Sequence, residues 1–409
     1  MHENRPLAVA KPAELRMPVD QDNQTTPATE VTFTPFAFAN ATGVFILIGA
    51  ISSLFGPLLV SFTQRFHLTL PSAGAALSVY FVGAGFGVLP GWLGMKRLEG
   101  RGVLIVSLLT IAAGAFAAAS TRSWTLFLIS VLLIGLGFGG LDISLNTLLA
   151  RTSLHGRVFR LSVGNAGYGV GAVISPLIIV LVRPGNFPLV FAGIGAVALI
   201  LSTLNGGVHA PPLHAEVLQR RITEMKSQRR PILITFIVAY ILYVAIETGS
   251  AGWMATQLHG EGFSQSVGSF VTAGFWSGMA IGRSLGGPLY HRLSDKILVL
   301  AGLAGAIFVC LAAFSSTIAP YAYPLLGLIL ASIFPMGLMW YSILCPHDSD
   351  GISWLILFMM IGGVAGPGAL SLMVSQFGVH VVPLTIATFA ALDLLAFLSA
   401  LRFKALVVR

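Results

Sequence analysis

Twelve runs of mainly apolar residues constrain the fold of this 409-residue chain more than any other feature. A helix needs about 20 such residues to cross a bilayer core. The runs lie at 36–62, 71–93, 103–120, 125–150, 158–182, 187–206, 231–257, 264–289, 297–315, 320–344, 353–376 and 379–401. Only 9% of the residues are charged, against about 25% in an ordinary soluble domain. The pattern therefore predicts an all-α integral membrane protein with twelve transmembrane helices.

The Lys and Arg residues predict how this protein is oriented. With both termini inside, nineteen of the 23 Lys and Arg lie on the cytoplasmic side, Arg283 falls within a run, and only Arg65, Arg122 and Arg183 lie outside. Cytoplasmic loops of membrane proteins are enriched in Lys and Arg. We therefore expect a multi-pass protein of the cytoplasmic (inner) membrane, surrounded by lipid, with both termini cytoplasmic. Because these loops account for the net charge of +8, we expect no nucleic-acid partner.

A basic segment containing Pro211 and Pro212 follows the sixth run and divides the chain into two halves. The predicted parts are a disordered cytoplasmic tail (1–35), an N-terminal six-helix bundle (36–206), a cytoplasmic linker (207–230) and a C-terminal six-helix bundle (231–409). The halves also echo each other, because GWLGMKRLE after the second run returns as GPLYHRLSD after the eighth, and GNAGYGVG in the fifth run returns as GGVAG in the eleventh. Such duplication is typical of transporters with two pseudo-symmetric halves around a central site.

Asp142 is a carboxylate inside the fourth apolar run, within the segment GLGFGGLDISLNTLLAR. Asn146 is four residues later and therefore shares its helical face, while the glycines before Asp142 permit close approach of a neighbouring helix. Carboxylates in membrane spans are costly and usually face a polar cavity, so we expect Asp142 to couple transport to protons and Asn146 to bind the solute. The alternative is an Asp that is hydrogen-bonded inside the bundle without a role in transport.

Further polar and aromatic residues in the spans are candidates for solute binding. Glu247 and Arg283 lie on the seventh and eighth runs, where they either line the cavity or form a structural buried ion pair, and Glu247 is a second candidate for proton coupling. Asn165 and Tyr168 share one helical face and offer hydrogen bonds to hydroxyl groups. Two indoles are expected to stack on a sugar ring, those of Trp253 and Trp276. A further acid, Asp393, lies on the last run, which is expected to be peripheral.

The residues around the loop after the second run resemble the cytoplasmic loop signature of the major facilitator superfamily. Gly91, Arg97 and Arg101 match it, whereas Gly94 stands where the usual signature has an Asp. Gly-Leu-Asp142 with Asn146 and the glycine-rich fifth run are similar to the fucose/proton symporter and related sugar transporters, although the first run lacks the acidic residue of that branch. The resemblance implies the major facilitator fold, alternating access and a gating loop formed by Gly91, Arg97, Arg101 and, in the second half, Arg292.

Three classes of function follow from these features. The first is a secondary active transporter that imports a small polar solute, such as a sugar, coupled to protons through Asp142. The second is a proton-driven antiporter that exports apolar or drug-like compounds, and an uncoupled uniporter is a further alternative with the same fold. Ser175 stands directly before Pro176, where the exporter signature usually has Gly-Pro, and this difference favours the importer. The third class is a membrane enzyme or receptor, which should show a cluster of His, Asp or Glu. We find no such cluster and expect a monomer that is not an enzyme, with no metal site and no cofactor other than the proton gradient.

Overall fold

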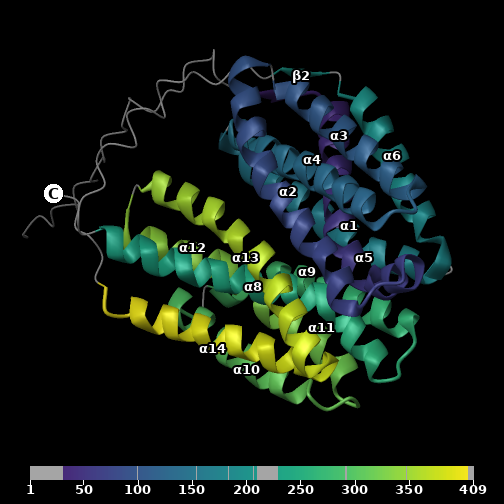
Figure 1. Ribbon diagram of the computed structural model, residues 1–409. Coiled ribbons are helices and arrows are strands. Elements are labelled where there is room, and N and C mark those ends of the chain that lie inside the picture. The colour runs from purple at the N-terminus through teal and green to yellow at the C-terminus, as the bar shows by residue number, and fades with distance from the viewer. Residues whose placement is uncertain are drawn as a thin grey trace, which may run out of the picture.

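The computed structural model describes residues 31–98, 100–152, 154–182, 184–205, 207–209, 229–290, 293–346 and 348–403. Its helices form two groups, which Figure 1 shows as an upper group in purple and blue and a lower group in green and yellow. The first group contains α1 (Pro35–Phe66), α2 (Leu70–Arg97), α3 (Gly100–Ser120), α4 (Trp124–Ala150), α5 (Leu154–Leu181), the short η3 (Pro184–Asn186) and α6 (Phe187–Thr203). The second contains α8 (Arg229–Gly260), α9 (Gln265–Tyr290), α10 (Asp295–Ala312), α11 (Ala319–Leu330), α12 (Ile333–Leu344), α13 (Ser349–Phe377), the short η4 (Val379–Val381) and α14 (Val382–Ala400).

All twelve predicted spans are helical in the part of the chain that is described. Ten helical stretches are long and apolar enough to cross a membrane, and α6 and α9 bring the number to twelve when α11 and α12 count as the single stretch Ala319–Leu344. The break inside that stretch falls at Ala331 and Ser332. Pro335 lies four residues after Ala331 and cannot donate to its carbonyl, so it explains why the helix is interrupted there.

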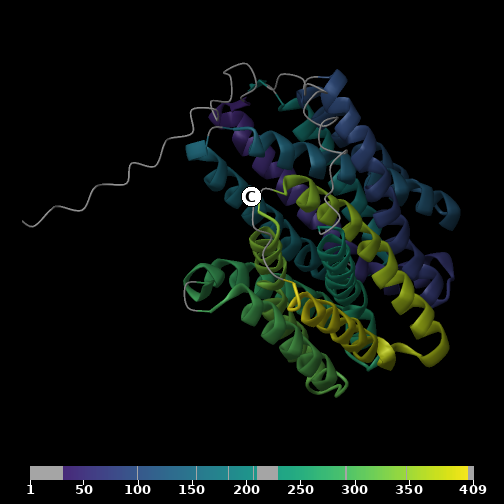
Figure 2. The same ribbon diagram turned by 90° about the vertical axis from the view of Figure 1, so that its left-hand side faces the viewer.

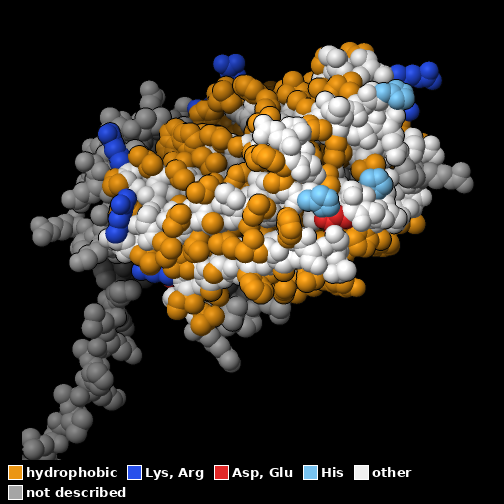
Figure 3. Space-filling model, turned by 60° about the horizontal axis from the view of Figure 1, so that its bottom comes forward, with side chains coloured by type: hydrophobic (Ala, Val, Ile, Leu, Met, Phe, Trp, Pro, Cys, Tyr) orange, Lys and Arg blue, Asp and Glu red, His pale blue; other side chains and the backbone are white. Residues whose placement is uncertain are grey.

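Consecutive spans run in opposite directions, so the loops that carry charged residues lie at two ends of the molecule. We call the end with Lys96, Arg97 and Arg101 the basic side, and the end with Arg65 and Arg122 the opposite side. Between the ends, hydrophobic side chains cover most of the face seen in Figure 3, where Lys and Arg side chains lie mainly at the edges. A broad apolar belt of this kind is what contact with lipid requires.

The segment before α1 is more ordered than the predicted disordered tail of residues 1–35. Thr32 and Phe33 form strand β1, which pairs antiparallel with β2 (Val208–His209) from the predicted linker 207–230. Val31 is buried and its N–H donates to the carbonyl of Arg151, while the Thr34 side chain caps α1 by accepting from the Ala37 N–H at 3.1 Å. These bonds order residues 31–35, so the prediction was wrong for them; residues 1–30 and 210–228 lie outside the described residues.

The glycines before Asp142 bring α4 into close contact with two neighbours, as predicted. A Cβ atom at Gly135 or Gly139 would collide with the carbonyl oxygens of Tyr80 or Ala84 on α2. On the other flank of α4, a Cβ at Gly137 would come within 2.5 Å of the Ser107 carbonyl oxygen on α3. Close backbone approach of this kind is how small residues drive helix association in membranes. It fixes the position of Asp142 relative to α2.

The two bundles meet along two pairs of helices that are equivalent by the internal repeat, because α9 corresponds to α2 and α13 to α5. α2 contacts α13 and α5 contacts α9, and Figure 2 shows α13, in yellow-green, running beside the first bundle. We call this interface between the two bundles the seam. Near the opposite side it is closed by polar contacts, and the Ser371 hydroxyl donates there to the Pro71 carbonyl at 2.8 Å. The Gln265 amide there donates to the Pro57 carbonyl at 3.0 Å and to the Ser61 hydroxyl at 2.9 Å.

Toward the basic side the same helices separate. On α2 the face that meets α13 carries Ser78 and Phe81, and a Cβ at Gly363 of α13 would lie 2.6 Å from the Phe81 ring. Farther along that face, a Cβ at Gly85 would meet no atom within 4 Å, and Leu89 is 60% exposed. The described structure is therefore closed at the opposite side and open toward the basic side.

Candidate functional site

Asp142 and Asn146 lie on one face of α4, as the sequence predicts. The Asn146 amide donates to the Asp142 side-chain oxygen Oδ1 at 3.0 Å and to the Asp142 carbonyl at 2.9 Å. Both side chains are partly buried rather than sealed in the core. The Asp142 carboxylate therefore has a hydrogen-bond donor within its own helix and remains accessible to further polar groups.

A tyrosine on α2 extends this polar site across the first bundle. Tyr80 is fully buried among the rings of Phe55, Phe81 and Phe138. Its hydroxyl lies 3.4 Å from the Ser52 hydroxyl on α1 and within electrostatic range of Asp142. Sequence reasoning missed both Tyr80 and Ser52, because a Tyr or Ser in an apolar run is ordinarily a packing residue and no spacing rule links them to α4.

Tyr168 and Trp276 contact each other across the seam and so extend the site from the first bundle to the second. Their rings meet edge to face with centroids 6.2 Å apart, one on α5 and the other on α9. The Tyr168 hydroxyl also interacts with Ser52 and lies within electrostatic range of Asp142. The Trp276 indole is 5% exposed, and its N–H has no hydrogen-bond partner among the described residues. A buried donor without a partner is costly, so this N–H is available to a ligand.

The second bundle adds the predicted charges Glu247 and Arg283. Arg283 interacts electrostatically with Glu247 and with the hydroxyls of Tyr168 and Tyr243. No ion pair within 4.0 Å joins Glu247 and Arg283 in the described part of the chain; a guanidinium nitrogen of Arg283 instead lies 3.3 Å from the sulfur of Met279. Glu247 and Arg283 therefore interact electrostatically over a longer distance and do not form the expected direct ion pair in the described part of the chain. Tyr243 on α8, which sequence reasoning missed, is buried, and its hydroxyl donates to the Leu330 carbonyl at 3.4 Å.

Two of the predicted solute-binding residues lie apart from this cluster. Trp253 is fully buried at the closed part of the seam, where its indole N–H donates to the Pro367 carbonyl at 3.2 Å and its ring fills the space that a side chain at Gly74 would need. Asn165 is exposed, and its amide donates to the Leu161 carbonyl one turn back at 2.9 Å. In this conformation Trp253 holds the bundles together rather than facing the open side.

The predicted gating loop is described in its first half only. Gly91 packs against α4, where a Cβ would lie 2.8 Å from the Cα of Gly140. Arg97 and Arg101 are exposed at the basic side. Arg292 lies outside the described residues, so its predicted role stays untested. Among the described residues, no group of three or more His, Cys, Asp or Glu side chains is placed to hold a metal ion.

Comparison with known proteins identifies the class of this chain. The sequence model of the Major Facilitator Superfamily matches residues 41–349, which is more than half of the chain. The chain therefore belongs to this superfamily of membrane transport proteins, which confirms the prediction of a transporter rather than an enzyme and the fold of two pseudo-symmetric six-helix bundles.

Particular relatives narrow the comparison. The chain is 30% identical over 145 residues to the L-fucose-proton symporter of Escherichia coli (strain K12), a stretch that covers 34% of this chain and 32% of the relative. Among solved structures, a D-xylose-proton symporter superposes with a TM-score of 0.75 at 14% identity, covering 92% of this chain and 100% of the other. The transporter FucP in the outward conformation gives 0.62 at 20% identity, covering 89% and 98%. At these identities the solved structures show the fold alone. The match to the L-fucose-proton symporter spans less than half of that relative's length.

Proposed function

We propose that this protein is a proton-coupled symporter that imports a small polar solute, most simply a sugar. One observation carries the proposal: Tyr168 of the first bundle meets Trp276 of the second edge to face, and Tyr168 lies within electrostatic range of both Asp142 and Glu247. A cluster of this kind offers a carboxylate for the proton, hydrogen bonds for hydroxyl groups and an aromatic face for a sugar ring. The relative named as an L-fucose-proton symporter, 30% identical over 145 residues, supports the same substrate class.

In the proposed cycle, Asp142 binds a proton and Asn146, Tyr168 and Trp276 bind the solute while the cavity faces outward. Burial in an apolar bundle disfavours the charged carboxylate, so proton binding lowers the cost of closing the cavity around it. The bundles then rock so that the seam closes at the opposite side and opens at the basic side. Release of the proton restores the charge on Asp142, and Glu247 with Arg283 assists the opening. The transporter acts as a monomer and needs no cofactor besides the proton gradient.

Uptake into proteoliposomes tests this function. We expect labelled L-fucose, D-xylose or another sugar of a panel to accumulate when the outside is more acidic, and to equilibrate without accumulation when no gradient is imposed. Equilibration that ignores the gradient would indicate a uniporter. Extrusion of apolar dyes driven by the same gradient, without sugar uptake, would indicate the antiporter.

The proposed orientation places the basic side in the cytoplasm of a cell with an inner membrane. The nineteen-to-three distribution of Lys and Arg supports it. A cysteine at position 122, in the loop between α3 and α4, should react with impermeant maleimide in intact cells, whereas a cysteine at position 220 should be protected until the membrane is opened. Labelling at position 220 from outside would reverse the orientation.

A further inference from the structure

A second hollow lies at the opposite side, where the closed seam between the bundles reaches the surface. It is a cavity of about 300 Å³, walled by the end of α1 and the following turn on one bundle and by the end of α8 and η4 on the other. Ligand sites in proteins begin at about this volume. Because both bundles contribute walls, the cavity exists in this form only while the opposite side is closed.

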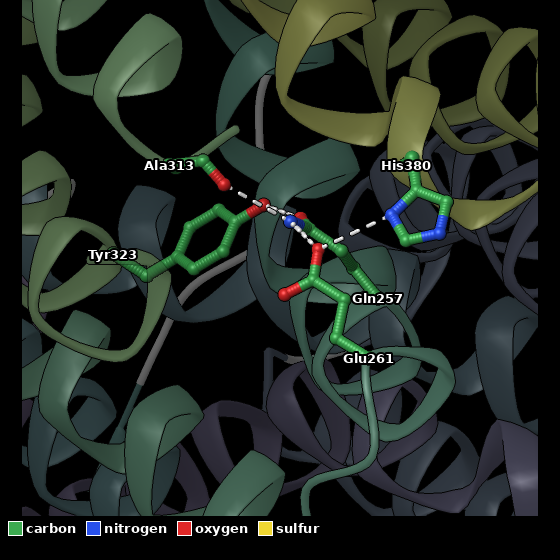
Figure 4. Close-up of polar contacts among 5 residues, drawn as sticks. All are labelled: Gln257, Glu261, Ala313, Tyr323 and His380. Atoms are coloured by element: carbon green, nitrogen blue, oxygen red, sulfur yellow. Dashed lines mark hydrogen bonds and ion pairs between the residues drawn. The ribbon is translucent and has the colours of Figure 1, made fainter. Parts of the chain in front are cut away.

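A hydrogen-bond network fixes the wall that the second bundle contributes (Figure 4). The Gln257 amide donates to Glu261 Oε1 at 2.8 Å and to the Ala313 carbonyl at 3.1 Å, and the Tyr323 hydroxyl donates to Gln257 Oε1. His380 on η4 reaches the same carboxylate, with Nδ1 3.7 Å from Glu261 Oε1.

Three members of this network are direct sequence neighbours of residues that line the cavity. Gln257 follows Thr256, Glu261 follows Gly260, and His380 follows Val379. On the facing wall, the bonds from Gln265 to Pro57 and Ser61 hold the bundles together beside the cavity. The hollow is therefore preformed, so a ligand need not order its walls.

Thr256 supplies an unsatisfied polar group in the wall of the cavity. It is 2% exposed, and its hydroxyl has no hydrogen-bond partner among the described residues. Several other threonines in the helices bond to a backbone carbonyl three or four residues back, as Thr248 does to Val244 at 2.7 Å. A buried hydroxyl without a partner costs free energy that a ligand hydroxyl would recover.

The remaining lining fits a neutral ligand with several hydroxyl groups. The Thr63 hydroxyl donates to the Val60 carbonyl at 2.8 Å and keeps its oxygen as an acceptor. The Nδ1 atom of His259 lies 3.2 Å from the Phe263 carbonyl, which leaves Nε2 for a ligand, and Gln64 adds an exposed amide. Among the described residues, no Lys, Arg, Asp or Glu lines the cavity, so its lining favours neither an anion nor a cation.

We propose that this cavity binds a small neutral polyhydroxy compound of about monosaccharide size, separately from the central site. A bound molecule contacts both bundles and stabilises the form that is closed at the opposite side. Binding does not depend on the proposed transport function. If that function holds, an occupied cavity delays the return of the empty transporter and slows uptake at high external sugar concentration.

A cysteine in place of Leu68, which lines the cavity in the turn after α1, provides a direct test in the full-length protein in detergent, without any gradient. The native thiols give little background, because Cys310 is buried and burial raises the pKa of Cys345 to about 11, so few thiolates exist at neutral pH. We expect L-fucose, D-xylose or mannitol to slow the reaction of the Leu68→Cys protein with maleimide in a saturable manner.

The same assay in a Leu68→Cys, Thr256→Val protein decides whether the cavity is responsible. Valine keeps the shape but removes the hydroxyl, so protection should require about fivefold more sugar, which corresponds to one lost hydrogen bond. Thr385→Val is the matched control, because that buried hydroxyl already bonds to the Val381 carbonyl and lies outside the cavity. Absence of protection by all three compounds, or equal protection with and without Thr256, would overturn the proposal.

Discussion

Asp142 and Asp393 are carboxylates in the interior of different bundles, and their surroundings differ. Asp142 is partly buried, accepts a hydrogen bond from Asn146 and has the Tyr80 hydroxyl within electrostatic range. Asp393 on α14 is fully buried, and neither of its oxygens has a hydrogen-bond partner among the described residues. Its neighbourhood is aromatic, since Phe397 one turn later stacks on Trp340 with ring centroids 5.7 Å apart.

The difference shows that burial alone does not mark a carboxylate for proton transfer. A group that gains and loses a proton must be tolerated in both forms, so its charged form needs donors or water nearby. Asp142 has such neighbours, whereas the surroundings of Asp393 suit only a neutral acid. We therefore propose that proton exchange takes place in the first bundle and that Asp393 has a packing role.

The largest effect that this comparison predicts is for Asp142→Asn. Asparagine keeps the shape and the bond to Asn146 but cannot titrate, so the variant should still exchange solute across the membrane while failing to accumulate it. One coupled charge at 100 mV is worth about 2.3 kcal/mol, or about 50-fold in concentration ratio, and this factor should be lost. Counterflow and gradient-driven uptake in proteoliposomes measure the two activities separately. Accumulation equal to that of the parent would move the coupling role to Glu247.

The next largest effect concerns Glu247 and Arg283, which interact without a direct ion pair. Replacing either with Gln leaves the other charge less compensated, so the single variants should lose stability and the double variant should lose less than their sum. Because no contact within 4.0 Å joins them, we expect a coupling of about 1 kcal/mol, below the cost of breaking a direct buried pair. Thermal unfolding of the four purified proteins gives this value. Strictly additive losses would show that the two groups act independently.

Most of the fold was predictable from the sequence, because length and hydropathy determine where a chain can cross a bilayer. The break at Ala331 and Ser332 was not predicted, although Pro335 was visible, since a proline in a membrane helix can be accommodated in more than one way. The order of residues 31–35 was missed because it depends on strand pairing with Val208 and His209, which are far away in sequence.

The candidate site was predictable only where a residue was unusual for its surroundings. Asp142, Glu247 and Arg283 stood out as charges in apolar runs, and the shared helical face of Asp142 and Asn146 followed from their spacing. Tyr80, Ser52 and Tyr243 did not stand out, because their roles arise from packing between helices. Trp253 was expected at the solute, yet its indole bonds to the Pro367 carbonyl at the closed seam, a contact that no sequence pattern specifies.

A smaller effect is expected for Tyr80→Phe, which tests whether the polar surroundings of Asp142 extend to α2. Phenylalanine keeps the ring contacts with Phe55 and Phe138 but removes the hydroxyl next to Ser52. Loss of one polar neighbour is worth about 1 kcal/mol, so gradient-driven uptake should fall about fivefold with little change in thermal stability. Tyr321→Phe, at a position that is 78% exposed, serves as the control and should leave uptake unchanged. Equal uptake by both variants would restrict the site to α4.

The smallest effect is expected for Asp393→Asn, and it is the one that most directly challenges the comparison. If Asp393 is a neutral acid held by packing, asparagine is a close replacement in size and charge, and the free energy of unfolding should change less than in Glu247→Gln or Arg283→Gln. Accumulation of solute should stay within about twofold of the parent, because by this reasoning the proton on Asp393 does not exchange during transport. Thermal unfolding and gradient-driven uptake of the same preparation measure both quantities. A loss of accumulation as large as that of Asp142→Asn, in a protein of unchanged stability, would show that an acid without visible partners does cycle its proton, and it would place a second coupling site in the C-terminal bundle.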